Sequence, residues 1–117
     1  MQEHKHSLTM DEQTVYLGKS TAIISYFTFV GLLIAISMNS EPKNPFARFH
    51  INQSAGLILS YLLIMIPVSY LNSFAAFIGF LIAFISLWLF GIVSAFQGKA
   101  TPIPLVGAFF QQVFGKI

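Results

Sequence analysis

Residues 74–97 read FAAFIGFLIAFISLWLFGIVSAFQ, the longest apolar run in the chain. At 1.5 Å per residue, about 24 residues of helix cover roughly 36 Å. A helix needs about 20 apolar residues to cross the ~30 Å hydrocarbon core of a bilayer. Gly98 and Lys99 follow, placing a glycine at the helix stop and a cation at the negative end of the helix dipole. The sequence therefore predicts a membrane-spanning α-helix over residues 74–97.

A second span is predicted over residues 54–71, in a helix whose polar opening begins at Phe46. Pro67 cannot donate a backbone hydrogen bond, so we expect a kink there. Only Asn72 and Ser73 separate this run from the next one. So short a link forces the two helices into an antiparallel hairpin.

A third span is predicted over residues 21–38, where about 18 residues of helix would cover roughly 27 Å. Its helix is allowed to begin as early as Asp11, with Thr9 as the N-cap. Residues 39–45 follow as a turn-rich loop with two prolines.

The two ends of the chain are predicted to lie outside the bilayer core. Residues 1–10 are polar and predict a flexible tail, so residues 11–117 form one helical membrane domain. Residues 105–116 predict an amphipathic interfacial helix, because about 13 apolar-rich residues are too few to span. Its apolar face consists of Leu105, Val106, Phe109, Phe110, Val113, Phe114 and Ile117, with Gln111 and Gln112 off that face. The expected fold class is thus all-α, with about three spans and a short interfacial helix.

Composition supports a lipid environment and excludes several function classes. Apolar residues make up 56% of the chain and charged residues 9%, against about 25% charged in a typical soluble domain. The net charge of +2 gives no basic footprint for nucleic acid. The chain has no cysteine, and from Pro42 onward it has no carboxylate side chain to orient a catalytic base. We therefore expect no enzymatic activity, no metal and no cofactor.

Lysine and arginine predict the orientation of the three spans. The loop after the first span shares a side with the C-terminus, and that side holds Lys43, Arg48, Lys99 and Lys116. The other side holds Lys19 and Lys5. This asymmetry favours a cytoplasmic C-terminus and an N-terminus on the opposite side.

One polar segment interrupts the apolar pattern. Phe46, Phe49, His50 and Gln53 recur at the i, i+3, i+4, i+7 spacing, which places them on one helical face, while Arg48 lies on another. Two interpretations stay open. His50 and Gln53 hydrogen-bond a neighbouring helix end or lipid headgroups, which we favour, or His50 senses pH at the membrane boundary.

Small residues recur every four positions in several places. Ala75, Gly79 and Ala83 form a stripe on residues 74–97, and Gly91 with Ala95, Ser94 with Gly98, and Gly31 with Ala35 repeat the spacing. Such stripes let helices approach closely in lipid. We expect them to pack the spans against one another rather than against a subunit. The opposite face of the last span is then expected to meet lipid; it holds Phe77, Leu81, Phe84 and Trp88.

Two motifs together resemble a known family. The first is Pro45-Phe46-Ala47-Arg48-Phe49-His50-Ile51-Asn52-Gln53, and the second is Gly91-Ile92-Val93-Ser94-Ala95-Phe96-Gln97-Gly98-Lys99 followed by Pro102, Pro104 and Gly107. Over residues 15–112 the chain resembles a family of small bacterial membrane proteins of unknown function. That family is related to the twenty-kilodalton membrane component of the chloroplast inner-envelope protein-import translocon. The chloroplast protein is described with four membrane helices, whereas three are counted here.

These observations lead to one expected function and one alternative. The resemblance implies a location in a bacterial cytoplasmic membrane. We expect a non-enzymatic accessory or scaffold subunit of a larger membrane complex, with a link to protein translocation. Its partners would be the lipid bilayer and another membrane protein. The alternative is a small homo-oligomeric channel or transporter, whose polar residues would converge on one axis. These would be Ser25, Thr28, Ser86 and Ser94.

Overall fold

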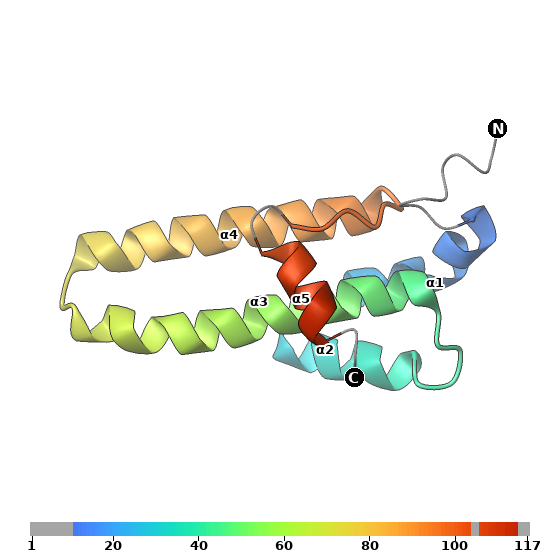
Figure 1. Cartoon of the computed structure of the whole chain (residues 1–117), viewed down its shortest axis with the longest axis horizontal. Coiled ribbons are helices and arrows are strands. Elements are labelled where there is room, and N and C mark those ends of the chain that lie inside the picture. The colour runs from blue at the N-terminus through green and yellow to red at the C-terminus, as the bar shows by residue number, and fades with distance from the viewer. Residues whose placement is uncertain (1–10, 104–105, 115–117) are drawn as a thin grey trace.

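The computed structural model describes residues 11–103 and 106–114, and within these residues the chain is all-α. Five helices follow one another, as Figure 1 shows. They are α1 (Glu12–Ile24), α2 (Phe29–Met38), α3 (Pro45–Tyr70), α4 (Phe74–Phe96) and α5 (Gly107–Phe114). The predicted all-α class is confirmed, and no strand occurs in the described part of the chain.

The hairpin of α3 and α4 forms as the sequence predicts. The α3 helix runs through Pro67, and α4 begins after Ser73, whose hydroxyl accepts a hydrogen bond from the Ala76 amide at 3.1 Å. Asn72 takes the left-handed conformation, with φ of 48°, that so tight a turn requires. At the other end of α4, Gly98 has φ of 75° and the Lys99 amide donates to the Ser94 carbonyl at 2.9 Å. This is a Schellman motif with glycine at its left-handed position.

The predicted continuous helix over residues 21–38 is wrong. The chain breaks at residues 25–28 into α1 and α2, and the N-cap of α1 is Asp11 rather than Thr9. The Thr28 hydroxyl caps α2 by accepting from the Gly31 amide at 3.2 Å. The Asn44 side chain, which follows α2, donates to the Thr14 carbonyl near the start of α1 at 2.9 Å. The two helices are therefore an antiparallel hairpin rather than one rod (Figure 1).

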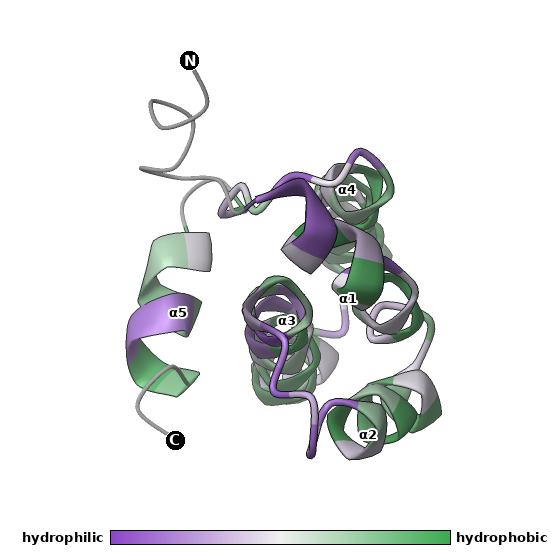
Figure 2. Cartoon of the chain, turned by 90° about the vertical axis from the view of Figure 1, so that its right-hand side faces the viewer, coloured by the Kyte–Doolittle hydropathy of each residue, from purple (hydrophilic) through white to green (hydrophobic). Residues whose placement is uncertain are grey.

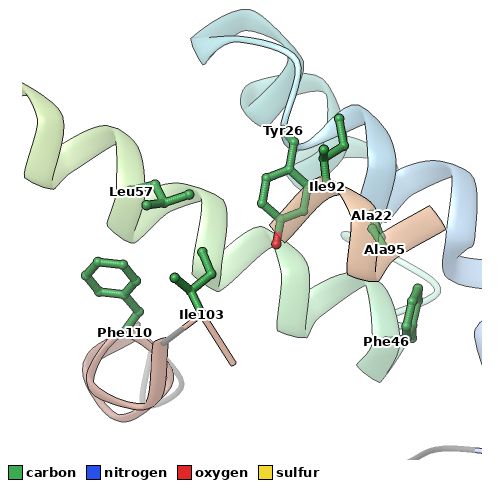
Figure 3. Packing of buried hydrophobic residues seen from close by; sticks show 8 residues of the cluster. All are labelled: Ala22, Tyr26, Phe46, Leu57, Ile92, Ala95, Ile103 and Phe110. Carbon is green, nitrogen blue, oxygen red and sulfur yellow. The ribbon is translucent and has the colours of Figure 1, made fainter. Parts of the chain in front are cut away.

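The core lies in one half of the molecule. Eight buried residues join α1, the first half of α3, the last half of α4, the segment after α4, and α5 (Figure 3). They are Ala22, Tyr26, Phe46, Leu57, Ile92, Ala95, Ile103 and Phe110. A smaller cluster of Leu32, Ala35 and Ile51 attaches α2 to α3. The other half of the α3–α4 hairpin projects beyond this packed end (Figure 1).

The faces of α4 differ from those predicted from the small-residue stripe, although Phe77 is exposed as predicted. Phe84 and Trp88 pack against the core, whereas Ala75, Gly79 and Ala83 are exposed. A Cβ placed on Gly79 would have no heavy-atom neighbour within 4 Å. The expected packing of this stripe inside the chain is therefore wrong.

The other two small-residue pairs with a glycine and an alanine do pack inside the chain. Gly91 and Ala95 are buried against α1, and a Cβ on Gly91 would lie 2.7 Å from the Tyr26 ring. Gly31 and Ala35 are buried on α2. Between helices in lipid, such close approach supplies the dispersion contacts that hydrophobic burial cannot.

The C-terminal helix α5 crosses α3 and packs on it (Figures 1 and 2). Gly107 and Phe110 are buried, and the Gln111 side chain donates to the Phe49 carbonyl at 2.8 Å. Gln111 thus faces the protein, while Phe109 and Val113 of the predicted apolar face are exposed. Leu105, Lys116 and Ile117 of the predicted helix lie outside the described residues.

Two helices, α3 and α4, are long and apolar enough to cross a membrane. A core helix of a soluble protein would pass the same test of length and composition, but it would be mostly buried. In the most apolar 18-residue windows, only 28% of the residues of α3 and 11% of those of α4 are buried. The α2 helix, at 10 residues, is too short to span. The predicted count of three spans is not confirmed.

Candidate functional site: a buried polar network at the start of α3

The face of α3 predicted from the sequence is turned into the protein. Phe46, His50 and Gln53 are fully buried, and Phe49 is half-buried beside them. Asn44 caps this helix by accepting from the Ala47 amide at 3.0 Å. The cap and Pro45 at the first turn fix where α3 begins, and so fix the direction in which this face looks.

Both ring nitrogens of His50 are bonded. Nδ1 lies 2.7 Å from the Tyr26 hydroxyl, and Nε2 lies 2.8 Å from the Lys99 backbone carbonyl. A carbonyl can only accept, so Nε2 carries the proton and Nδ1 of the neutral ring is an acceptor. The Tyr26 hydroxyl therefore donates to Nδ1. The imidazole bridges the end of the α1 segment and the end of the α4 segment.

Gln53 extends the network in the same direction. Its amide nitrogen donates to the Tyr26 oxygen at 2.9 Å, and its amide oxygen accepts from the Ile103 backbone N–H at 2.7 Å. Hydrogen bonds therefore run from Ile103 through Gln53, Tyr26 and His50 to the Lys99 carbonyl, and each donor has one acceptor. This consistency fixes the tautomer of His50 and the orientation of the Gln53 amide.

Aromatic rings enclose the imidazole. The ring centroids of Tyr26, Phe46 and Phe49 lie 5.5, 4.9 and 5.1 Å from that of His50, all in edge-to-face geometry. Such spacing is the favourable one for aromatic pairs. The rings therefore surround the carbon atoms of the imidazole, and its two nitrogens reach their hydrogen-bond partners between them.

The same region satisfies the backbone at the break between α1 and α2. The Ser54 hydroxyl donates to the Ser25 carbonyl, and the Trp88 indole N–H donates to the Tyr26 carbonyl at 2.6 Å. The Ser25 hydroxyl returns to the Ala22 carbonyl at 2.7 Å. Carbonyls that a broken helix would leave unpaired are thus bonded by side chains from α1, α3 and α4.

The structure brings together some of the sequence-predicted residues and separates others. The Lys99 carbonyl, Gly98 and Gly91 join His50 and Gln53 at the packed end. Arg48 lies on an exposed face of α3, and Pro102 is exposed in the segment before α5. Gly79 lies in the second turn of α4, where an added Cβ would have no neighbour within 4 Å, and so makes no contact with the network. Pro104 lies outside the described residues.

Sequence reasoning missed Tyr26, Ser54, Trp88 and Ile103. Tyr26 and Trp88 lie in apolar runs, where only their polar atoms signal a need for buried partners. The Ile103 contribution is a backbone N–H, which no residue pattern reveals.

The hydroxyls proposed for a channel axis are used locally. Those of Ser86 and Ser94 donate to carbonyls of α4, that of Thr28 caps α2, and that of Ser25 lies within hydrogen-bond distance of the Ala22 carbonyl of α1 and the His50 carbonyl of α3.

The network has the character of a structural bridge. In residues 11–103 and 106–114, every buried side-chain nitrogen or oxygen has a hydrogen-bond partner. No group of three His, Cys, Asp or Glu side chains that could hold a metal occurs in the same part of the chain. The His50 ring has both nitrogens engaged, so its geometry positions the segment after α4 against the α1–α2 turn.

No protein-family model, curated protein or solved structure matches this chain.

Proposed function

We propose that this chain is an integral membrane protein with two complete spans, α3 and α4, and an α1–α2 hairpin that enters the bilayer halfway. Large apolar side chains with about half or more of their surface exposed support the proposal. They occur along α2, α3 and α4, and include Val30, Leu33, Leu62, Leu63, Ile66, Leu71, Phe74 and Ile82. In water a surface of this kind would aggregate, whereas in lipid it is the ordinary outer face.

Helix lengths fit this arrangement. At 1.5 Å per residue, the 26 residues of α3 and 23 of α4 extend about 39 and 35 Å, near the ~40 Å of a bilayer with its interfaces. The 10 residues of α2 extend about 15 Å, or half of the ~30 Å hydrocarbon core. A chain reversal inside hydrocarbon requires bonded backbone groups. The bonds from Ser54 and Trp88 to the turn carbonyls meet that requirement.

The distribution of charge supports a topology in which the start of α1 and the end of α4 lie on the same side of the membrane. Lys19, Lys43, Arg48 and Lys99 lie at the packed end, while residues 51–98 contain no charged side chain. The hydrogen bond from Asn44 to Thr14 joins the start of α1 to the loop before α3. Figure 2 looks onto this end, where hydrophilic segments gather in front of apolar helices. By the positive-inside rule we propose that this end faces the cytoplasm and that the α3–α4 turn lies on the opposite side; that the membrane is bacterial rests on the resemblance alone.

The biochemical role proposed is that of a non-enzymatic accessory subunit, docked to a larger membrane protein through α4. The observation that carries this role is the open stripe of Ala75, Gly79 and Ala83, which has no partner helix among the described residues. Close helix packing in lipid uses such small residues. The link to protein translocation rests on the resemblance of the His50 and Gly91–Lys99 motifs alone.

The test is purification of a tagged chain from its native membrane in mild detergent, with mass spectrometry of bound proteins. The parent should retain a larger membrane protein. Gly79→Leu should lose it while keeping its own thermal stability, and Phe77→Leu, on the other side of α4, should keep it. Recovery of only a second copy of the chain would favour the homo-oligomeric channel instead. Equal retention of the partner by both variants would remove α4 as the docking face.

A further inference from the structure

A hollow lies at the packed end, apart from the His50 network. It has a volume of about 530 Å³ and lies between the end of α2, the loop before α3, the first turns of α3, and α5. This volume is within the range of ligand pockets, roughly 300–1,000 Å³.

One part of the hollow is basic and polar. Lys43 and Arg48 line it together with Asn39, Ser40 and Asn52. Lys43 comes from the loop and Arg48 from the first turn and a half of α3, so two cations on different elements share one pocket. Their charge and the neighbouring amides suit a phosphate group.

The other part is apolar. Ile36 of α2, Ile51 and Ala55 of α3, and Phe114 of α5 complete the wall. Ile51 and Ala55 follow Arg48 along α3 by about 5 and 10 Å at 1.5 Å per residue. Along α3 the wall of the hollow therefore changes from the cationic Arg48 to the apolar Ala55 over about 10 Å, with Ile51 and Asn52 between them.

We infer that this hollow binds an anionic phospholipid, with the phosphate beside Lys43 and Arg48 and an acyl chain along Ile51 and Ala55. The inference rests on the proposed membrane location. Within a bilayer the amphiphile that combines negative charge and hydrocarbon in this order is an acidic lipid. The site would fix α5 and α2 to the start of α3, since the ligand contacts all three.

The experiment measures lipid binding by native mass spectrometry of the full chain, delipidated in a zwitterionic detergent. Dioleoyl-phosphatidylglycerol and dioleoyl-phosphatidylcholine are titrated separately; they share phosphate and chains, but choline cancels the charge. We expect phosphatidylglycerol to bind at least tenfold more tightly. Lys43→Gln and Arg48→Gln should each weaken it about fivefold, as expected for one cation near anionic lipid. Lys19→Gln removes the same charge from α1, outside the pocket, and should change nothing.

Two further measurements distinguish binding of the whole lipid from binding of its phosphate group alone. Ala55→Leu fills the apolar section without changing charge, and should weaken phosphatidylglycerol binding several-fold. Inorganic phosphate at millimolar concentration should not displace the lipid. Displacement by phosphate, or equal affinity for the two lipids, would overturn the inference. If Ala55→Leu does not fold, the comparison of Lys43→Gln and Arg48→Gln with Lys19→Gln still tests whether the lipid binds in this hollow.

Failure here is distinguishable from failure of the membrane proposal. Flotation of the parent chain with pure phosphatidylcholine vesicles tests membrane insertion without any anionic lipid. A chain that floats but shows no preference for phosphatidylglycerol retains its membrane assignment and loses this site.

Discussion

Tyr26 makes hydrogen bonds with side chains of both α3 and α4. Its hydroxyl donates to His50 and accepts from Gln53, while its backbone carbonyl accepts from Trp88. One residue thus contacts α3 twice and α4 once from a position just after α1. Because each bond is directional, the loss of one group leaves a defined partner without its bond.

A double-mutant cycle tests this arrangement. Removal of the imidazole in His50→Leu leaves the Tyr26 O–H without its acceptor and the Lys99 carbonyl without its donor, at a cost of about 1–3 kcal/mol, while the bond from Gln53 to the Tyr26 oxygen remains. Tyr26→Phe removes the hydroxyl alone and should cost about 1 kcal/mol. Because the two changes break a shared bond, the double variant should be more stable than the sum predicts, by about 0.5–1 kcal/mol. The measurement is reversible unfolding in mixed micelles. Strict additivity would mean that the bond contributes nothing to stability.

At this scale the sequence predicts the face of α3 but not its partners. The i, i+3, i+4, i+7 spacing of Phe46, Phe49, His50 and Gln53 is a local property of one helix. The Tyr26 hydroxyl and the Lys99 carbonyl come from 24 and 49 residues away along the chain. Their contact depends on the fold, and one of them is a backbone atom that any residue would supply.

At the scale of elements, the break between α1 and α2 is the feature that hydropathy could not predict. Residues 21–38 are apolar with only short polar interruptions, and a rod or a hairpin would bury the same side chains in lipid. Ser25 and Thr28 are good capping residues, but serine and threonine also occur inside membrane helices, where they bond to the preceding turn. The bonds that Ser54 and Trp88 make to the turn carbonyls decide between the two.

The faces of α4 show a similar limit. A stripe of small residues predicts close packing, but it does not say whether the partner belongs to the same chain. Gly91 and Ala95 pack on α1, whereas a Cβ added to Gly79 would have no neighbour within 4 Å. The pair of Gly79 and Ala83 nevertheless has the same spacing as the pair of Gly91 and Ala95. The Trp88 indole, bonded to the Tyr26 carbonyl, sets which side of α4 faces inward.

Paired glycine variants test the docking of α5. A Cβ on Gly56 would overlap the Phe110 ring, so Gly56→Ala should displace α5 from α3 at a cost of about 1–3 kcal/mol. Gly79→Ala makes the same chemical change in open space and should leave stability unchanged or raise it by about 0.5 kcal/mol through helix propensity. Thermal aggregation in mild detergent compares them. The docking of α5 would be refuted if both variants melted with the parent.

At the scale of the whole molecule, packing and charge gather at the same end. The core, the buried network and the described lysines and arginine all lie there, while the far half of the α3–α4 hairpin has apolar side chains facing outward. In a soluble protein these apolar side chains would have to be buried by other elements of the chain. In a bilayer lipid surrounds them, and the stability of the chain depends on the contacts at the packed end.

Topology is the property on which the hairpin and the rod differ most. A continuous first span would place the start of α1 and the loop at residues 39–44 on opposite sides of the membrane. The contact between Thr14 and Asn44, and the approach of Val15 to Gly98, instead put the start of α1, that loop and the end of α4 on one side. All four described lysine and arginine positions then share that side, which satisfies the positive-inside rule more fully than the split that three spans require.

Single cysteines at exposed positions measure this directly, because the native chain has none. Gln13→Cys in the first turn of α1 and Ser40→Cys in the loop should react alike with a membrane-impermeant maleimide in intact cells, and both should be protected. Leu71→Cys at the α3–α4 turn should be labelled, since the proposed topology puts that turn on the outer side. Detergent-treated cells control for reactivity at each position, and all three cysteines should label there. Opposite labelling of Gln13→Cys and Ser40→Cys would restore a first span that crosses completely. The Asn44–Thr14 bond could then not exist in the membrane, because its two ends would be separated by about 30 Å of hydrocarbon.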